Sequence, residues 1–247
     1  MPPPLSRNSR LAVGFVVVVV VAATAWIVLM GRDGVEGSSK DPDLHADGRL
    51  DPGFHAPPVD AHFSGQVVEP EPETWTDVRP SSEYRVLVLA DGRDERTARD
   101  PQVAILVDAV QRWAREEDRV ELTIDYLTDP HAYIDAIDRA AIADEADLIV
   151  TAGNQLVDPV AVVSANYAGE EPQQFLVLGA EVAEPTHNIA ASDWQGSAYL
   201  GEGVRESDYY DPAAVTGPRA YAALRAGVAA VLSGYGGVIV RIPADHY

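Results

Sequence analysis

Polar side chains that could bind a ligand follow three short apolar runs of the sequence. If those runs are strands of one parallel sheet, the side chains meet beyond the carboxyl ends of the strands, where open parallel sheets bind ligands. Carboxylates and amides supply hydrogen-bond acceptors and donors, and an indole ring offers a stacking face. The predicted ligand-binding residues are Asp91 after residues 84–90, Gly153, Asn154 and Gln155 after residues 147–152, and Asp193 and Trp194 after residues 188–192.

The same residues have a structural interpretation that the sequence leaves open. Asp193 could cap a helix that begins near Gln195, and Asp158 could do the same one helix earlier. Trp194 could pack as a lid on the core, because a large aromatic ring is more often buried than displayed. A binding site and a set of structural residues are therefore both compatible with this pattern.

No catalytic motif accompanies these residues. The sequence has no G-x-G-x-x-G after its first apolar run, no G-x-x-x-x-G-K-[ST] and no G-x-S-x-G. It has no cysteine, which excludes thiol catalysis, zinc–thiolate sites and disulfides. Asp94 and Glu95 could hold Mg²⁺ together with Asp91, but Arg93 and Arg96 are adjacent salt-bridge partners. We predict that the protein is not an enzyme and has no cofactor or metal site.

The elements that must position the candidate residues alternate between strands and helices. This rhythm predicts an α/β fold of three layers, Rossmann-like, with a mostly parallel sheet and helices on both faces. We expect one domain over residues 84–247. The predicted strands are 84–90, 122–127, 147–152, 174–178, 188–192 and 238–242, and the predicted helices are 101–113, 133–141, 155–168, a stretch from about 195, and 218–232.

An uncharged run of twenty residues, Leu11 to Met30, lies near the N-terminus. It is long enough to cross a bilayer as a helix. Arg7 and Arg10 precede it, so the positive-inside rule places residues 1–10 in the cytoplasm and the later residues outside. We predict a single-pass cell-membrane protein with an extracytoplasmic C-terminal domain. A cleaved secretory signal is the alternative, because Ala23-Thr24-Ala25 has the A-x-A pattern.

Residues 31–83 have the composition of a disordered linker. Seven prolines interrupt them, and no apolar periodicity is sustained, so they offer little surface to bury. Beyond Arg32 the chain carries all 39 acidic residues against 15 of its 18 basic residues. Such a negative field repels phosphate backbones, so we expect no nucleic-acid partner.

One part of the chain resembles a known family. The basic membrane protein family comprises nucleoside-binding substrate-binding lipoproteins of ABC transporters. In that family a strand ending in glycine leads into a helix, and an N-V-A-S strand leads into a Y-L-A-G helix. The resembling segments here are 147–153, 156–160, 166–168, 174–178, 187–192 and 199–201. The resemblance implies a periplasmic-binding-protein-like lobe, a nucleoside or similar polar ligand, and a permease as partner.

This chain departs from the family pattern at several positions. Only Asp91 matches the family's D-x-S-F-N motif, Asn154 replaces an aromatic residue, and Gly179 replaces an aspartate. The chain also has length for one lobe where family members have two, so a second lobe or a second copy could complete the site. Two functions remain open. One is a module that binds or senses a small polar ligand, and the other is a structural or protein-interaction domain that kept the fold and lost the pocket.

Overall fold

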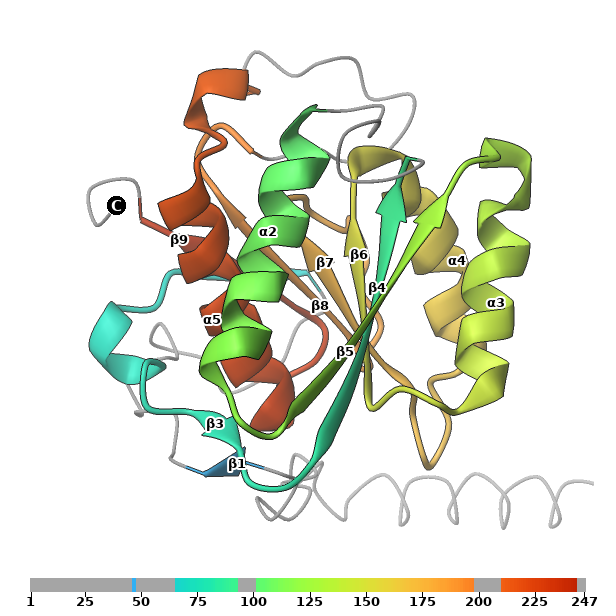
Figure 1. The fold of residues 1–247 in the computed structure, drawn as a ribbon, viewed down its shortest axis with the longest axis horizontal. Helices are drawn as coiled ribbons and strands as arrows, with labels where there is room; N and C mark the ends of the chain where they lie inside the picture. The colour runs from blue at the N-terminus through green and yellow to red at the C-terminus, as the bar shows by residue number, and fades with distance from the viewer. Residues whose placement is uncertain (1–45, 48–64, 93–100, 198–209, 244–247) are drawn as a thin grey trace, which may run out of the picture. The chain divides into compact units, whose positions relative to one another are not determined.

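The computed structural model describes residues 46–47, 65–92, 101–197 and 210–243 (Figure 1). The predicted membrane span, residues 31–45 and 48–64 of the predicted linker, residues 93–100 and most of the helical stretch predicted from about residue 195 lie outside these residues. Among the helices that are described, none is long and apolar enough to cross a membrane.

The centre of the fold is a seven-stranded sheet in which every pair of neighbours is parallel. The strand order is β2-β9-β8-β7-β6-β4-β5. The inner strands β6, β7 and β8 are buried almost throughout, as their apolar sequences require of strands covered on both faces. The strands are β2 Gln66–Val68, β4 Tyr84–Asp91, β5 Val120–Leu127, β6 Leu148–Ala152, β7 Gln174–Leu178, β8 Ile189–Trp194 and β9 Val238–Ile242.

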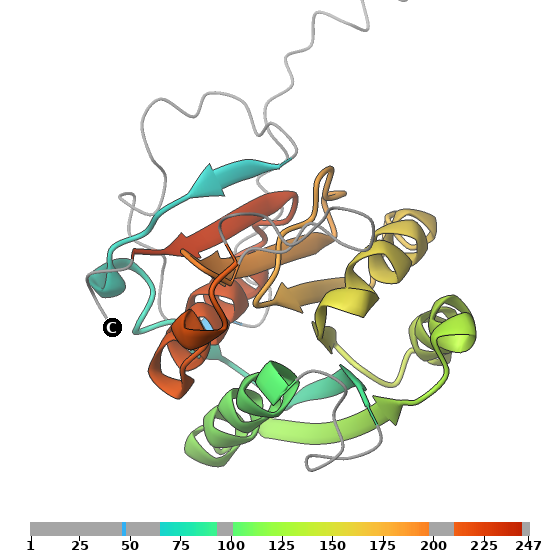
Figure 2. The same cartoon turned by 90° about the horizontal axis from the view of Figure 1, so that it is seen from above.

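Helices cover both faces of this sheet, so the three layers predicted from the sequence are confirmed (Figures 1 and 2). On one face lie α2 (Pro101–Glu116) and α5 (Gly217–Leu232), and on the other lie α3 (Tyr133–Ala143) and α4 (Val157–Asn166). Each face has its own hydrophobic core cluster. Short 3₁₀ turns complete the connections: η2 Pro72–Thr74, η3 Pro130–Ala132, η4 Asn154–Leu156 and η5 Pro212–Ala214.

The predicted linker boundary needs correction, because residues 65–83 belong to the folded domain. Strand β2 pairs with β9, and Val68, Trp75 and Val78 are buried in the core beside α5. A strand of three residues has too little pattern to be recognised in sequence, and its partner lies far along the chain. The prolines that suggested disorder have a structural use here, since Pro72 begins the η2 turn.

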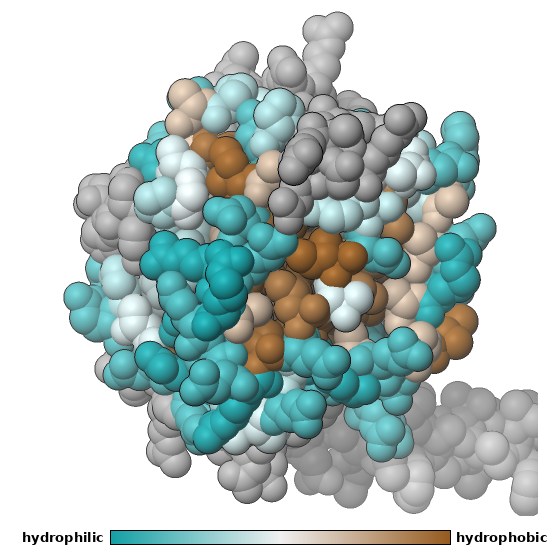
Figure 3. Space-filling view, viewed as in Figure 1, coloured by the Kyte–Doolittle hydropathy of each residue, from teal (hydrophilic) through white to brown (hydrophobic). Residues whose placement is uncertain are grey.

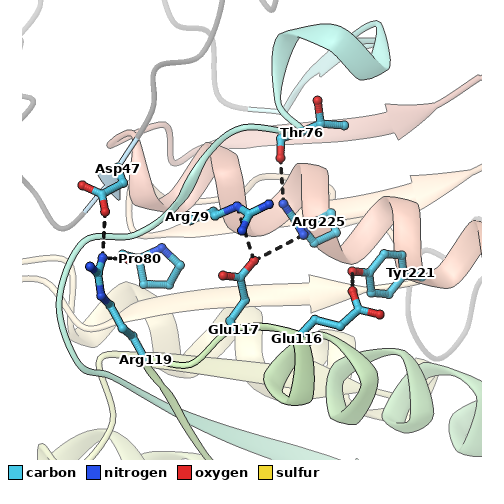
Figure 4. Close-up of polar contacts among 9 residues, drawn as sticks. All are labelled: Asp47, Thr76, Arg79, Pro80, Glu116, Glu117, Arg119, Tyr221 and Arg225. Atoms are coloured by element: carbon cyan, nitrogen blue, oxygen red, sulfur yellow. Dashed lines mark hydrogen bonds and ion pairs between the residues drawn. The ribbon is translucent and has the colours of Figure 1, made fainter.

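Hydrogen bonds, and an ion pair between Arg79 and Glu117, fasten this segment to α5 and to the residues that follow α2 (Figure 4). Arg225 of α5 donates to the Thr76 carbonyl at 2.8 Å and lies 3.3 Å from the Glu117 carboxylate. Strand β3 (Arg79–Pro80) pairs antiparallel with β1 (Ala46–Asp47). Arg119 joins both strands, with its Nη1 atom 2.7 Å from Asp47 Oδ2 and 3.0 Å from the Pro80 carbonyl.

Candidate functional site

The connections reverse direction at β4, and this reversal locates the candidate site. The chain passes from β4 through α2 to β5 on one side, then through α3 to β6 on the other side of β4. The carboxyl ends of β4 and β6 therefore form a topological switch point, the usual ligand position in such sheets. Asp91 and Gly153 adjoin there. A Cβ atom on Gly153 would lie 2.9 Å from Asp91 Cβ, and Gly153 has φ of 125°, so this position requires glycine.

A small cleft opens beside the switch point, between the N-terminus of α2 and the ends of β6, β7 and β8. Its volume is about 30 Å³, which is room for one or two water molecules. Three of the six predicted ligand-binding residues line it, namely Gly153, Asn154 and Trp194. The other lining residues are Gln102, Val103, Leu106, Leu178, Gly179, Ser197, Tyr210 and Val215.

Asn154 carries the strongest chemical signal in this cleft. Its Oδ1 atom is buried and has no hydrogen-bond partner in the described part of the chain. A buried acceptor without a donor costs about 1–3 kcal/mol. A ligand or a water that donates an N–H or O–H group there would recover that cost. Asn154 is thus the lining residue with an unmet hydrogen-bonding requirement.

Asp91 and Gln155 do not line the cleft. Asp91 is buried on the opposite face of the sheet, where its carboxylate accepts a hydrogen bond from the Tyr133 hydroxyl of α3. Gln155 is partly exposed in the η4 turn. The structure therefore separates these two from Asn154, although they are close in sequence or in register.

Asp193 is also engaged inside the protein. It is 0% exposed, and Arg241 of the neighbouring strand donates to it from Nε at 3.2 Å and from Nη2 at 3.0 Å. Arg241 donates to Glu181 as well, so one guanidinium serves two carboxylates. Burial raises the pKa of Asp193 to about 7, outweighing the opposing attraction of Arg241. This carboxylate is not available to the cleft.

Trp194 lines the cleft as a core residue. It is 1% exposed, and its Nε1 atom donates to the Ala214 carbonyl at 2.8 Å. Ser197 holds the backbone of the same residue, with its hydroxyl 3.0 Å from the Trp194 amide nitrogen. The packing interpretation of Trp194 is therefore the one that the structure supports, and little of the ring is free to stack on a ligand.

Gly179 also lines the cleft, although in the sequence it was notable only because it replaces an aspartate of the resembling family. Its φ is 78°, and a Cβ atom there would lie 3.0 Å from Leu106 Cδ2. An aspartate at this position, as in the resembling family, would push into the space of the cleft. The signal in sequence was a glycine directly after β7, the buried strand next to β6. Gln102 and Tyr210 gave no such signal, because each comes from a segment distant from the strand ends.

No group of three histidine, aspartate or glutamate side chains placed to hold a metal ion occurs in residues 46–47, 65–92, 101–197 and 210–243. The proposed Mg²⁺ ligands Asp94 and Glu95 lie outside these ranges.

No family model matches the chain, and no curated protein matches it. Similar solved structures include an ABC transporter solute-binding protein from Aeropyrum pernix K1. It is 24% identical over 46% of this chain and 29% of its own, with a TM-score of 0.38. A protein named as a lipoprotein fragment from Peptoclostridium difficile 630 is 19% identical over 44% of this chain and 84% of its own, with a TM-score of 0.38.

A third structure, a periplasmic ribose ABC transporter from Conexibacter woesei DSM 14684, is 13% identical over 66% of this chain and 55% of its own, with a TM-score of 0.36. The matched part of this chain thus spans 29% of the first structure and 55% of the third. At TM-scores below 0.5 these likenesses decide nothing about function. The α/β architecture rests on the strand order and pairing described above, and the basic membrane protein resemblance stays a prediction.

Proposed function

We propose that this protein is a membrane-anchored, extracytoplasmic module of the solute-binding-protein type, and that it binds or senses a small polar ligand without catalysis. The observation that carries the proposal is the buried Oδ1 atom of Asn154 at the switch point of the sheet, for which the described residues offer no hydrogen-bond donor. The anchor rests on the apolar run Leu11 to Met30. A nucleoside is the ligand class that the family resemblance implies.

The cleft sets a limit on affinity. Ligand pockets commonly have volumes of about 300–1,000 Å³, whereas this cleft accepts only water-sized groups. Most of a nucleoside would therefore stay outside it, and a second lobe, a second copy or a permease would have to supply the remaining contacts. Losing half the contacts of a micromolar site, from about −8 to about −4 kcal/mol, leaves millimolar binding. We expect the monomer to bind no tighter than high micromolar.

The test is a thermal-shift and calorimetry screen of the full chain in detergent, with nucleosides and other small polar solutes. A ligand at about 100 times its dissociation constant stabilises the folded state by about 2.7 kcal/mol. Asn154→Leu should remove the shift because it deletes the unmet acceptor. Gln155→Leu is the matched control, since the adjacent Gln155 does not line the cleft. A shift that survives Asn154→Leu would contradict this site, and nanomolar binding by a proven monomer would contradict the affinity limit.

A protein-interaction domain that kept the fold and lost its pocket is the second candidate. Asp91 and Asp193 favour it, because both are buried and bonded to side chains of the protein itself. The small volume of the cleft points the same way. If no solute shifts the unfolding temperature of the wild-type chain, this second function is the one to pursue.

A further inference from the structure

A groove of about 520 Å³ runs along strands β4 and β5 beside helix α3. It lies on the α3 face of the sheet, whereas the cleft beside Asn154 lies on the α2 face. Strand β5 lines it from Glu121 to Leu127, a length of about 20 Å. This length suits an element of a protein better than a small solute.

The floor of the groove is apolar, because strand leucines and helix alanines form it. These residues are Leu87, Leu89 and Leu127 of the strands and Ala136, Ala140 and Ala143 of α3. The short alanine side chains leave the space beside the sheet unfilled. Figure 3 shows hydrophobic side chains gathered between α2 and α3, framed by hydrophilic ones. An exposed apolar surface with a polar rim is typical of a protein-interaction site.

Charged side chains of both signs border this floor. Arg85 and Glu121 adjoin in register at the amino-terminal end of the strands, and Glu145 lines the same end. Arg85 is already engaged there, since its Nη2 atom lies 2.7 Å from Asp147 Oδ1. The charges that are open to a new partner therefore lie further along the groove.

Helix α3 runs antiparallel to β4, and this fixes the height of Arg139 in the groove. The Tyr133 hydroxyl at the start of α3 donates to Asp91 at the carboxyl end of β4. Just beyond the other end of α3, the Asp144 carbonyl accepts from Arg85 Nη1 at 3.3 Å. Arg139 lies about midway between these two contacts, at the height of the middle of β4.

Asp125 lines the opposite wall at nearly the same height. It is in register with Leu89 of β4. Arg139 and Asp125 are both exposed, and neither forms a hydrogen bond or an ion pair with another described residue. Each wall of the groove thus offers one charge, positive on α3 and negative on β5, to an occupant.

Helix α3 also displays large apolar side chains beside Arg139. Four such side chains are exposed in the described chain, and two of them, Ile134 and Ile142, belong to α3. Ile142 is 65% exposed and lies three residues after Arg139, so the two are neighbours on the helix surface. A cation beside an apolar side chain matches a groove with an acidic wall and an apolar floor, which is the groove that α3 itself borders.

We propose that the groove docks helix α3 of a second copy of this chain, so that two copies form a two-fold symmetric dimer. In such an interface Arg139 of each copy pairs with Asp125 of the other. The eleven residues of α3 span about 16 Å, which fits the groove. About a two-fold axis beside Arg139 the two α3 helices run antiparallel. Ile142 of each copy then lies toward the carboxyl ends of the other copy's strands, over the end of the floor at Leu127.

The mixture of charges favours a second copy over other occupants. A uniformly basic or uniformly acidic segment would match one wall and be repelled by the other, whereas α3 and β5 of a second copy supply both signs. The formal net charge of −21 opposes association at long range. Salt at physiological ionic strength screens that repulsion beyond about 8 Å, while the contacts between Arg139 and Asp125 are shorter.

The test is analytical ultracentrifugation of the full chain in detergent at physiological salt, over a range of concentrations. We expect a reversible dimer. Arg139→Asp alone, or Asp125→Arg alone, should raise its dissociation constant at least about a hundredfold, because each change disrupts two symmetric contacts. Arg115→Asp and Glu170→Arg are the matched controls, since they make the same charge changes at exposed residues outside the groove, and they should leave the dimer intact.

Charge exchange separates a direct contact from a folding defect. Mixing the two single variants restores both pairs in a heterodimer, and combining them in one chain restores both pairs in a homodimer. Each should recover dimerisation to within about tenfold of the wild type. Ile142→Asn should weaken the dimer by about tenfold. Val162→Asn is its control, because Val162 is 57% exposed on α4 and does not line the groove.

The proposal is overturned if the wild type stays monomeric at every concentration, or if the control variants weaken the dimer as much as the groove variants do. It is also overturned if neither the mixture nor the double variant recovers dimerisation. A dimer that is insensitive to both single variants would assign association to another part of the chain, such as the predicted membrane span, and would overturn it as well.

Discussion

Replacing Asp193 by asparagine should stabilise the domain at neutral and alkaline pH, although it removes an ion pair. Asp193 is fully buried, and Arg241, its partner, keeps 27% of its side chain exposed and also serves Glu181. The carboxylate therefore loses its hydration, and the one cation that contacts it among the described residues is shared with Glu181. Asparagine has nearly the same shape and carries no charge to desolvate, so Arg241 can remain bonded to Glu181.

The magnitude follows from the pKa of Asp193, which burial raises from 3.8 to about 7. Each pKa unit corresponds to about 1.4 kcal/mol, so charging Asp193 in the folded state costs up to about 4 kcal/mol relative to the unfolded chain. The folded state holds the proton more tightly than the unfolded state. Stability from this group is therefore fully present below pH 4 and is lost as pH rises through about 7.

The assay is urea unfolding of the wild type and of Asp193→Asn at pH values from 4 to 8. Titrating groups away from the Asp193–Arg241–Glu181 cluster are common to both proteins and cancel in the difference between their free energies of unfolding. That difference should be small near pH 4 and should grow to about 2–4 kcal/mol in favour of Asn at pH 8. A wild type that becomes the more stable protein as pH rises would refute the reasoning. It would show that the attraction of Arg241 outweighs burial and lowers the pKa.

Four further predictions follow from the packing. Gly179→Ala should destabilise the domain by about 1–3 kcal/mol in urea unfolding, because φ is 78° and the new Cβ would press on Leu106; an unchanged midpoint would contradict this. Trp194→Ala should cost about 3–5 kcal/mol in the same measurement, since the ring is buried. Limited proteolysis with mass spectrometry should leave a core that begins near Gly65, and one beginning twenty residues later would count against the corrected boundary. The full chain should stay with membranes after alkaline washing, whereas a soluble form starting at Trp26 would identify a cleaved signal.

The larger elements could be predicted because each carries its own hydrophobic period in the sequence. Strand β7 matches the predicted range 174–178, and α5 begins one residue before the predicted helix. Strand β2 was not predicted, because its three residues are recognisable as a strand only through their pairing with β9, which follows about 170 residues later. The lack of a hydrogen-bond donor for Asn154 Oδ1 among the described residues was not predicted either, for a related reason. Whether an amide oxygen lacks a donor depends on every neighbour that folding brings near it, and no local pattern records that.

The separation of Asp193 from Trp194 traces to a small difference in one strand boundary. The fifth predicted strand ends at Ser192, which leaves Asp193 and Trp194 as loop residues free to reach the same cleft. In the structure β8 continues through Trp194. Successive residues of a strand point to opposite faces, so the two side chains must separate. Trp194 packs in the core beneath α2 and α5, and Asp193 turns to the other face, where Arg241 and Glu181 hold it. Residues at strand ends can share a ligand only if the strand stops before them, and here pairing with β9 extends β8 past that point.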